Sequence, residues 1–270
     1  MGAAKLDRHS IIENAVRAGA AAMLKFDASS VDVRVKSTAG DFVTEADLAS
    51  EQSIMAVITA SFPRDIIISE ETKAGQNLLV PDQLSKFSGW VMDPIDGTNN
   101  YKRDLHFSGV SLAYVEHGEV VLGAIFDPYR DEFYFAKQGG GATCNGATIQ
   151  IGSHTRLSPD TRVVTGNNYA AGGTLTNLEV YNRLGHVWVD VLGCAVLVMA
   201  DIACGRLDLY FHNGLSPWDN AAGFLIVAET GGKITDWHGR PVTWLAREMV
   251  LGNPVLVDAF VAALAQDMEK

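Results

Sequence analysis

The sequence is poor in cysteine, in clustered positive charge and in long apolar runs, and each shortage excludes a class of protein. Its three cysteines, Cys144, Cys194 and Cys204, are an odd number without CxxC spacing, which argues against structural disulfides and favours a reducing cytoplasm. The net charge is −11 and lysine and arginine form no cluster, so nucleic acid is not an expected partner. Apolar stretches such as "CAVLVMADIAC" are too short to span a bilayer. The N-terminus shows no signal peptide, and we therefore expect a cytoplasmic protein that does not enter a membrane.

The 270 residues are enough for one large domain or for two closely packed halves. Residues 8–26 have the periodicity of an amphipathic helix, and Gly19 falls on its apolar face, where a missing side chain would let another element approach closely. A second helix is predicted from Thr44 to Ser61, ended by Pro63.

Two short apolar runs of the buried-strand type lead directly into carboxylates. "DIIIS" (65–69) precedes Glu70 and Glu71, and "GWVM" (89–92) precedes Asp93. Pro94 has no N–H to donate, so we expect the second strand to end at Asp93. Because ligands of layered α/β proteins gather at strand ends, these carboxylates are candidates for a site.

The pattern of predicted helices and strands changes near residues 108 and 150. Residues 108–149 alternate strands with the turns "EHGE" and "DPYRD", which predicts an antiparallel meander. The second half is predicted to contain a strand at "RVVTG", helices near 174–185 and 193–204, a strand at "LDLYF" and a helix over 217–230. We therefore expect a first half, 1–150, that carries most of the acidic positions, packed against a second half, 151–270.

Two acidic residues fit helix starts. Thr44 and Asp47 have capping-box spacing, and Ser216 and Asp219 repeat it, with a proline at the first helical position. Helix capping alone would explain each of these two aspartates.

Asp93 and Asp96 lie so close in the sequence that their charges repel unless a cation lies between them. Pro94 and Ile95 between them can turn both carboxylates and the Ile95 carbonyl toward one point. Oxygen ligands of this kind suit Mg²⁺. The N–H groups of Gly97 and Thr98 that follow could hold an anion. This order of groups is expected for metal-assisted phosphate chemistry.

Four segments together resemble the signatures of the inositol monophosphatase family: "DFVTEAD" (41–47), "SEE" (69–71), "WVMDPIDGTNNY" (90–101) and "SPWDNAAG" (216–223). They occur in the family's order, and "ETGG" (229–232) fits as well. The resemblance implies an α+β fold, the layered α-β-α-β-α sandwich of the lithium-sensitive sugar phosphatases. It also implies a Mg²⁺-dependent phosphomonoesterase with two or three Mg²⁺ ions per site, a small phosphate-ester substrate and a homodimer.

The resemblance also assigns roles to residues. Glu70, Asp93 and the Ile95 carbonyl would hold one ion, and Asp93, Asp96 and Asp219 a second. Thr98 and Asp47, with Glu70, would orient and deprotonate the attacking water. The substrate would contact these positions: Asp96, Gly97, Thr98, Gly193, Cys194, Ala195, His212 and Asp219.

The position seven residues before Asp219 departs from the family pattern. Inositol-selective members tend to have a glutamate there, and this chain has His212. An imidazole offers different hydrogen bonds from a carboxylate, which puts myo-inositol 1-phosphate in doubt as the main substrate. Lys36 and Glu71 are further candidates for a loop contact near the site.

Three alternatives remain open at this point. The first is an inositol-1-monophosphatase. The second is a relative that acts on histidinol phosphate, fructose 1,6-bisphosphate or 3′-phosphoadenosine 5′-phosphate. The third, from a different class, is a regulatory metal-binding interaction protein without turnover.

Overall fold

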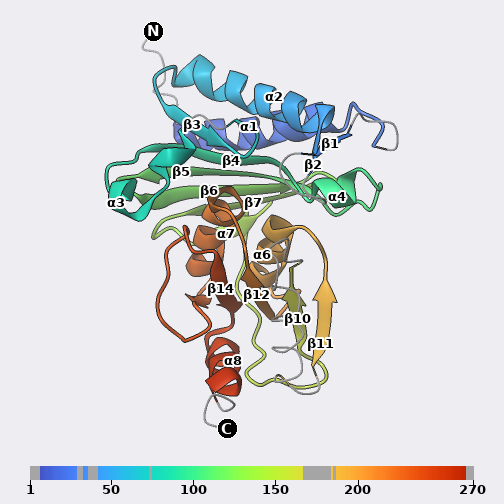
Figure 1. Ribbon diagram of the computed structural model, residues 1–270, viewed down its shortest axis with the longest axis vertical. Coiled ribbons are helices and arrows are strands. Elements are labelled where there is room, and N and C mark those ends of the chain that lie inside the picture. The colour runs from blue at the N-terminus through green and yellow to red at the C-terminus, as the bar shows by residue number, and fades with distance from the viewer. Residues whose placement is uncertain are drawn as a thin grey trace.

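Two β-sheets lie between three layers of helices in the computed structural model (Figure 1). The structure describes residues 7–28, 33–35, 42–72, 75–166, 184 and 187–265. From the N-terminal side, the layers are α1 and α2, a seven-stranded sheet, α6 and α7, a five-stranded sheet, and α8. This order confirms the predicted α-β-α-β-α sandwich. The seven-stranded sheet is formed by residues before residue 150 and the five-stranded sheet by residues after it, while the division of the chain into halves 1–150 and 151–270 stays a prediction.

The first helical layer consists of α1 (Arg8–Met23) and α2 (Glu45–Ser61). α1 ends at Met23, three residues earlier than predicted, and α2 starts directly after its predicted N-cap, Thr44. The two helices pack closely at Gly19, as expected, because a Cβ atom there would lie 2.7 Å from a carbon of Ile54. A two-stranded ribbon of β1 (Val33–Val35) and β2 (Phe42–Thr44) leads into α2.

The seven-stranded sheet follows the order of the chain, β3 to β9. β3 and β4 are parallel, and every later pair is antiparallel, which confirms the predicted meander. The strands are β3 (Ile66–Ser69), β4 (Gly89–Asp96), β5 (Gly109–Glu116), β6 (Glu119–Asp127), β7 (Glu132–Lys137), β8 (Ala142–Cys144) and β9 (Ala147–Thr148). Three short helical segments connect them: η1 (Gln76–Leu78), α3 (Pro81–Leu84) and α4 (Thr98–Tyr101). β3 is an edge strand, and Ile66 at its start is exposed, so only the second half of the "DIIIS" run is buried.

The prediction that Pro94 ends its strand is wrong. β4 continues to Asp96, and its register with β5 shifts between Asp93 and Asp96. A β-bulge inserts extra backbone that is not part of the ladder, so a proline is tolerated there. The bulge therefore contains the residues between the two carboxylates.

The five-stranded sheet has the order β11-β10-β12-β14-β13. Its strands are β10 (Arg162–Thr165), β11 (Trp188–Val191), β12 (Leu209–Asn213), β13 (Lys233–Thr235) and β14 (Glu248–Gly252). β10, β11 and β12 run parallel, and β14 is antiparallel to both of its neighbours. α8 (Pro254–Ala265) packs on this sheet, and the helix predicted near 174–185 lies outside the described residues except for Leu184.

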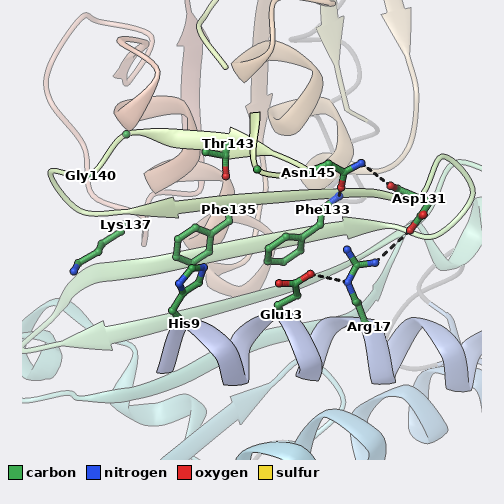
Figure 2. A pocket seen from close by; sticks show the side chains of 12 residues that line it. His9, Glu13, Arg17, Asp131, Phe133, Phe135, Lys137, Gly140, Thr143 and Asn145 are labelled. Atoms are coloured by element: carbon green, nitrogen blue, oxygen red, sulfur yellow. Dashed lines mark hydrogen bonds and ion pairs between the residues drawn. The ribbon is translucent and has the colours of Figure 1, made fainter. Parts of the chain in front are cut away.

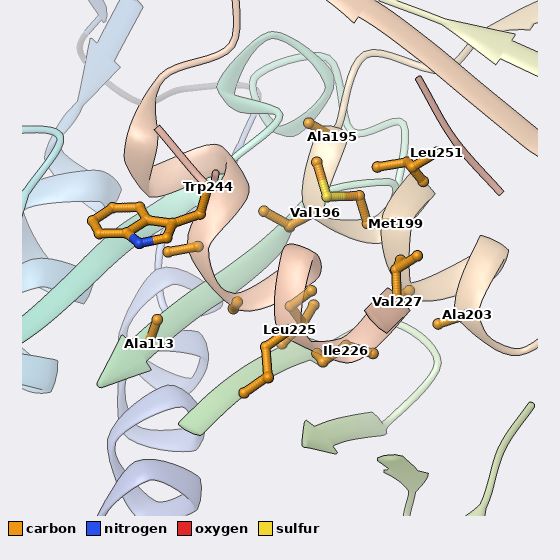
Figure 3. Packing of buried hydrophobic residues seen from close by; sticks show 14 of the residues in the cluster. Ala113, Ala195, Val196, Met199, Ala203, Leu225, Ile226, Val227, Trp244 and Leu251 are labelled. Carbon is orange, nitrogen blue, oxygen red and sulfur yellow. The ribbon is translucent and has the colours of Figure 1, made fainter. Parts of the chain in front are cut away.

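α6 (Ala195–Ala203) and α7 (Pro217–Glu229) form the layer between the sheets (Figure 3). All nine residues of α6 are buried, which explains why eight of them are apolar; the ninth, Asp201, forms ion pairs with Arg130 and Arg206. Figure 3 shows Val196 and Met199 of α6 beside Leu225 and Val227 of α7. Nowhere in the described part of the chain is a helix both long and apolar enough to cross a membrane.

Candidate metal centre and active site

Three carboxylates converge where β4 meets the first turn of α7. Asp93, Asp96 and Asp219 each offer an oxygen atom within 4.8 Å of the other two. Asp93 is buried, and the other two are half-buried. Carboxylates this close repel one another in a medium of low dielectric constant, and a cation between them removes that repulsion. The donor set consists of hard oxygen atoms, which fits Mg²⁺.

The bulge in β4 is held by one hydrogen bond within the strand and one from α2. The Ile95 N–H donates to Asp93 Oδ1 at 3.0 Å, and the Ser50 hydroxyl donates to the Pro94 carbonyl at 2.8 Å. Both Pro94 and Ile95 are buried. Buried backbone groups need partners, and these two bonds supply them where the ladder is interrupted.

Asp96 receives support from α6. The Val196 N–H, in the first turn of that helix, donates to Asp96 Oδ2 at 2.7 Å. Burial raises the pKa of Asp96 to about 6, the negative charge of Glu70 adds to this rise, and backbone hydrogen bonds from Val196 and Gly97 oppose it. One of the two amides expected to bind an anion, that of Gly97, therefore also supports a carboxylate.

Asp47 and Thr98 lie side by side, as the resemblance implies. Asp47 is fully buried at the start of α2, where the Thr44 N–H donates to Asp47 Oδ2 at 2.7 Å. The Thr98 hydroxyl lies 3.2 Å from Asp47 Oδ1 and 3.1 Å from the Ile95 carbonyl oxygen, and its single hydrogen can go to either acceptor. The capping box thus fixes the carboxylate that contacts Thr98.

Asp219 is held in the same way at the start of α7. The Ser216 N–H donates to Asp219 Oδ2 at 2.7 Å, and Pro217 occupies the first helical turn. Capping and a role in the site are compatible here, because the cap fixes the side chain where it meets Asp93 and Asp96.

Glu70 and Glu71 follow β3 at the edge of the sheet. The Glu70 N–H donates to the Met92 carbonyl at 3.3 Å, which continues the pairing of β3 with β4 beyond the end of the strand. Glu70 is not part of the three-carboxylate group, but its charge affects the pKa of Asp96. Glu71 is half-buried, and Lys36 lies outside the described residues.

Gly193, Cys194 and Ala195 precede and begin α6, and they pack against the turn at Gly97. Gly97 has a φ of 83°, and a Cβ atom there would lie 3.1 Å from Cys194 Cβ and 3.3 Å from the Gly193 carbonyl oxygen. Asn100 connects the same parts of the chain, since its side-chain amide donates to the carbonyls of Phe107 and Leu192. The substrate side predicted from the sequence is therefore adjacent to the carboxylates.

His212 lies in β12 as a buried, neutral imidazole. Burial lowers the pKa of His212 from 6.5 to about 4, and its Nδ1 has no hydrogen-bond partner within the described residues. Its ring is 5.9 Å from that of Tyr210, which shares its face of the strand. Burial raises the pKa of Tyr210 well above 10, with further contributions from Asp96 and Asp219, which places this face near the carboxylates. The imidazole also fills the space over Gly166, where a Cβ atom would collide with it.

A separate hollow of about 730 Å³ lies between α1 and the strands β7 and β8 (Figure 2). His9 stacks on Phe135 there, with ring centroids 4.2 Å apart, and Arg17 pairs with Glu13 and Asp131. None of the residues predicted for the site lines this hollow.

Four residues of the site region were not predicted from the sequence: Ser50, Asn100, Val196 and Tyr210. Ser50, Asn100 and Val196 act through hydrogen bonds between segments far apart in the chain, for which no local pattern exists. The segment "TNNY" did offer one signal, because asparagine side chains frequently bond to backbone groups near helix starts.

Comparisons with known proteins identify the family of the chain. The family model described as "Inositol monophosphatase family" matches residues 7–269. Nus factor SuhB of Escherichia coli (strain K12) is 36% identical over 231 residues, which cover 84% of each chain. The fructose-1,6-bisphosphatase/inositol-1-monophosphatase of Thermotoga maritima is 32% identical over 241 residues, which cover 88% of each chain.

A solved structure has a similar fold. The extragenic suppressor protein suhB from Bartonella henselae superimposes with a TM-score of 0.87 at 26% identity, over 96% of this chain and 99% of that one. The predicted resemblance is thereby confirmed over nearly the whole sequence. The chain belongs to the inositol monophosphatase family.

Proposed function

We propose that the chain is a Mg²⁺-dependent phosphomonoesterase that hydrolyses a small polyol or sugar phosphate, with myo-inositol 1-phosphate as the first candidate. The observation that carries this proposal is the convergence of Asp93, Asp96 and Asp219 within 4.8 Å, beside the Asp47–Thr98 pair. Membership of a family of phosphatases supports it. A cluster of carboxylates can bind a phosphate ester only through cations, because the negative charges otherwise repel each other.

We propose that two or three Mg²⁺ ions bind at this site, where the carboxylates of Asp93, Asp96 and Asp219 supply hard oxygen ligands. Glu70, Asp93 and the Ile95 carbonyl would hold one ion, and Asp93 would share a second with Asp96 and Asp219. When bound, the ions supply positive charge to the phosphate oxygens and to the leaving oxygen. The chain contributes the positions of the carboxylates through the bulge in β4 and the cap of α7.

Asp47 and Thr98 would handle the proton of the attacking water. The water oxygen forms a bond to phosphorus, the ester P–O bond breaks, and the leaving oxygen takes a proton from solvent water to become the alcohol. Thr98 would accept a hydrogen bond from the water while it donates to Asp47, whose carboxylate would take up the proton. Phosphoryl transfer depends mostly on such positioning and on electrostatics.

The alcohol side of the substrate would contact Gly193, Cys194, Ala195 and His212. A neutral imidazole provides one donor and one acceptor, whereas a glutamate provides acceptors only. We therefore keep histidinol phosphate, fructose 1,6-bisphosphate and 3′-phosphoadenosine 5′-phosphate as alternative substrates. The name of the Thermotoga relative gives two activities, fructose-1,6-bisphosphatase and inositol-1-monophosphatase. It therefore supports testing both inositol 1-phosphate and fructose 1,6-bisphosphate as substrates.

The test is the release of phosphate from these three esters and from myo-inositol 1-phosphate, measured as kcat/KM with and without Mg²⁺. We expect turnover to require Mg²⁺ and to be suppressed by Li⁺. Turnover that persists in the presence of a chelator would refute the mechanism. Sedimentation velocity on the same sample tests the homodimer that the family resemblance implies.

A second candidate function follows from the relative named Nus factor SuhB. It is the role of a regulatory metal-binding protein that interacts with transcription components and has no turnover. The net charge of −11 favours a protein partner over direct binding to nucleic acid. Absence of hydrolysis of every ester in the panel, despite Mg²⁺ binding, would favour this function over the first.

A further inference from the structure

Ser50 is a buried polar residue that the proposed mechanism does not use. It lies in α2, one turn after Asp47, and its side chain is inaccessible to solvent. A serine inside a helix commonly bonds to a carbonyl of its own helix. Ser50 instead donates its hydrogen to the Pro94 carbonyl oxygen, 2.8 Å away in β4. The hydroxyl therefore connects α2 to the bulge that separates Asp93 from Asp96.

The accepting carbonyl belongs to a peptide group whose other end contacts Asp93. The Pro94 C=O and the Ile95 N–H lie in one rigid plane, because the peptide bond does not rotate. The Ile95 N–H donates to Asp93 Oδ1 at 3.0 Å. A bond that fixes the direction of the carbonyl thus also fixes the direction of the N–H, and with it the carboxylate of Asp93.

The β-sheet does not fix this peptide in the usual way. Asp93 pairs with Ser111 of β5, and the next pair is Asp96 with Gly109, so the residues between them lie in the register shift. Without the Ser50 hydroxyl, the Pro94–Ile95 peptide group would lose its hydrogen bond to α2, and the buried Pro94 carbonyl would lose a hydrogen-bond partner.

Gly19 of α1 lies on the other side of Ser50. A Cβ atom at Gly19 would lie 2.8 Å from Ser50 Oγ, so the absence of a side chain there leaves room for the hydroxyl. The hydroxyl is consequently enclosed between α1 and the bulge, where water cannot replace it.

We propose that Ser50 is a positioning residue of the metal centre, which orients the Asp93 carboxylate toward Asp96 and Asp219 through the Pro94–Ile95 peptide. This inference rests on the proposed function, because it assumes that the three carboxylates bind Mg²⁺. It concerns a residue outside the carboxylate cluster, and its effect is on metal affinity.

The test is isothermal titration of the full chain with Mg²⁺ alone, without substrate. We expect Ser50→Ala to weaken Mg²⁺ binding by about 10-fold, the size typical when a residue that orients a metal ligand is removed. Ser53→Ala is the matched control, because Ser53 is in the same helix and donates to the Ala49 carbonyl of that helix at 2.8 Å. The control should bind Mg²⁺ like the unsubstituted chain.

Ser50→Cys provides a second variant, because a thiol is a weak donor of similar shape. We expect its affinity for Mg²⁺ to lie between those of the alanine variant and the unsubstituted chain. If the alanine variant does not fold, the cysteine variant is compared with the unsubstituted chain instead. Unchanged Mg²⁺ affinity in the folded variants, even with a lowered Tm, would overturn the inference and leave Ser50 a structural role. Failure of the unsubstituted chain to bind Mg²⁺ would refute the proposed function itself, so the two failures are distinguishable.

Discussion

The Thr98 hydroxyl lies 3.2 Å from Asp47 Oδ1, although the two residues are 51 positions apart in the chain. Thr44 binds Oδ2 of the same carboxylate, so each of the two oxygens of Asp47 has a contact of its own. Asp47, in the first turn of α2, is thereby placed beside Thr98, which follows the end of β4 at Asp96. Substitutions of Thr98 therefore test the proposed mechanism.

Thr98→Val is expected to lower kcat by about 10²-fold or more, the range typical for loss of proton transfer in a reaction. Valine has a similar shape but cannot pass a proton to Asp47. Thr98→Ser, which keeps the hydroxyl, should retain most of the activity. Equal losses in the two variants, measured by steady-state kinetics at saturating Mg²⁺, would contradict the role of the hydroxyl.

Asp93→Asn is expected to reduce kcat/KM by at least about 10²–10³-fold, as for removal of one electrostatic contact to a transition state. An amide has nearly the same shape as a carboxylate but lacks the charge that a shared ion requires. The fold should persist, which circular dichroism can show. Near-normal turnover in this variant would rule out Asp93 as the shared ligand.

His212→Glu is expected to shift the ratio of kcat/KM values toward inositol phosphates by about 10-fold, because a charged acceptor forms a stronger hydrogen bond with a ring hydroxyl. The control is His238→Glu, at an exposed position. We would abandon a role of His212 in specificity if the ranking of the substrate panel stayed the same.

The buried imidazole of His212 also predicts a dependence of stability on pH. The folded chain keeps His212 neutral until its pKa of about 4, whereas in the unfolded chain the group has its ordinary value of 6.5. As the pH falls from 6.5 to 4, the unfolded state therefore takes up a proton first and is favoured. The loss of unfolding free energy between pH 7 and 4.5 should be smaller by about 2 kcal/mol in His212→Gln.

Urea unfolding at the two pH values measures this difference. His238→Gln is the matched control, because it replaces a histidine by the same residue at an exposed position. If His212→Gln loses as much unfolding free energy between pH 7 and 4.5 as the unsubstituted chain, the imidazole is not held neutral in the folded state.

Gly19→Ala is expected to lower the free energy of unfolding by about 1–3 kcal/mol, the usual cost of overfilling a packed interface. The added methyl group would meet Ile54 at 2.7 Å and Ser50 at 2.8 Å. On an open helix surface the same change would stabilise by about 1 kcal/mol. The sign of the change in a urea titration therefore decides whether α1 and α2 touch at this position.

Local patterns predicted the elements that local interactions form. The capping box at Thr44 and Asp47 located the start of α2, and the turns at 116–119 and 127–131 located the hairpins of the meander. Both depend on residues within a few positions of each other. The family motifs added the identity of the carboxylates, which no periodicity could provide.

Features that depend on distant partners were not predictable in this way. Pro94 looks like a strand end from its neighbours alone, yet β4 continues because β5 accommodates a bulge. The bond from Val196 to Asp96 joins residues 100 positions apart. Such contacts follow from the packing of layers, which a single sequence does not reveal.

The third carboxylate of the cluster comes from α7, on the far side of the first sheet from α1. A nascent chain that has left the ribosome only as far as α6 would carry Asp93 and Asp96 but no Asp219. Competence to bind the metal would then appear late in synthesis, after more than four-fifths of the 270 residues have been added. A product that ends before α7 would lack Asp219 and, with it, the third carboxylate of the proposed metal centre.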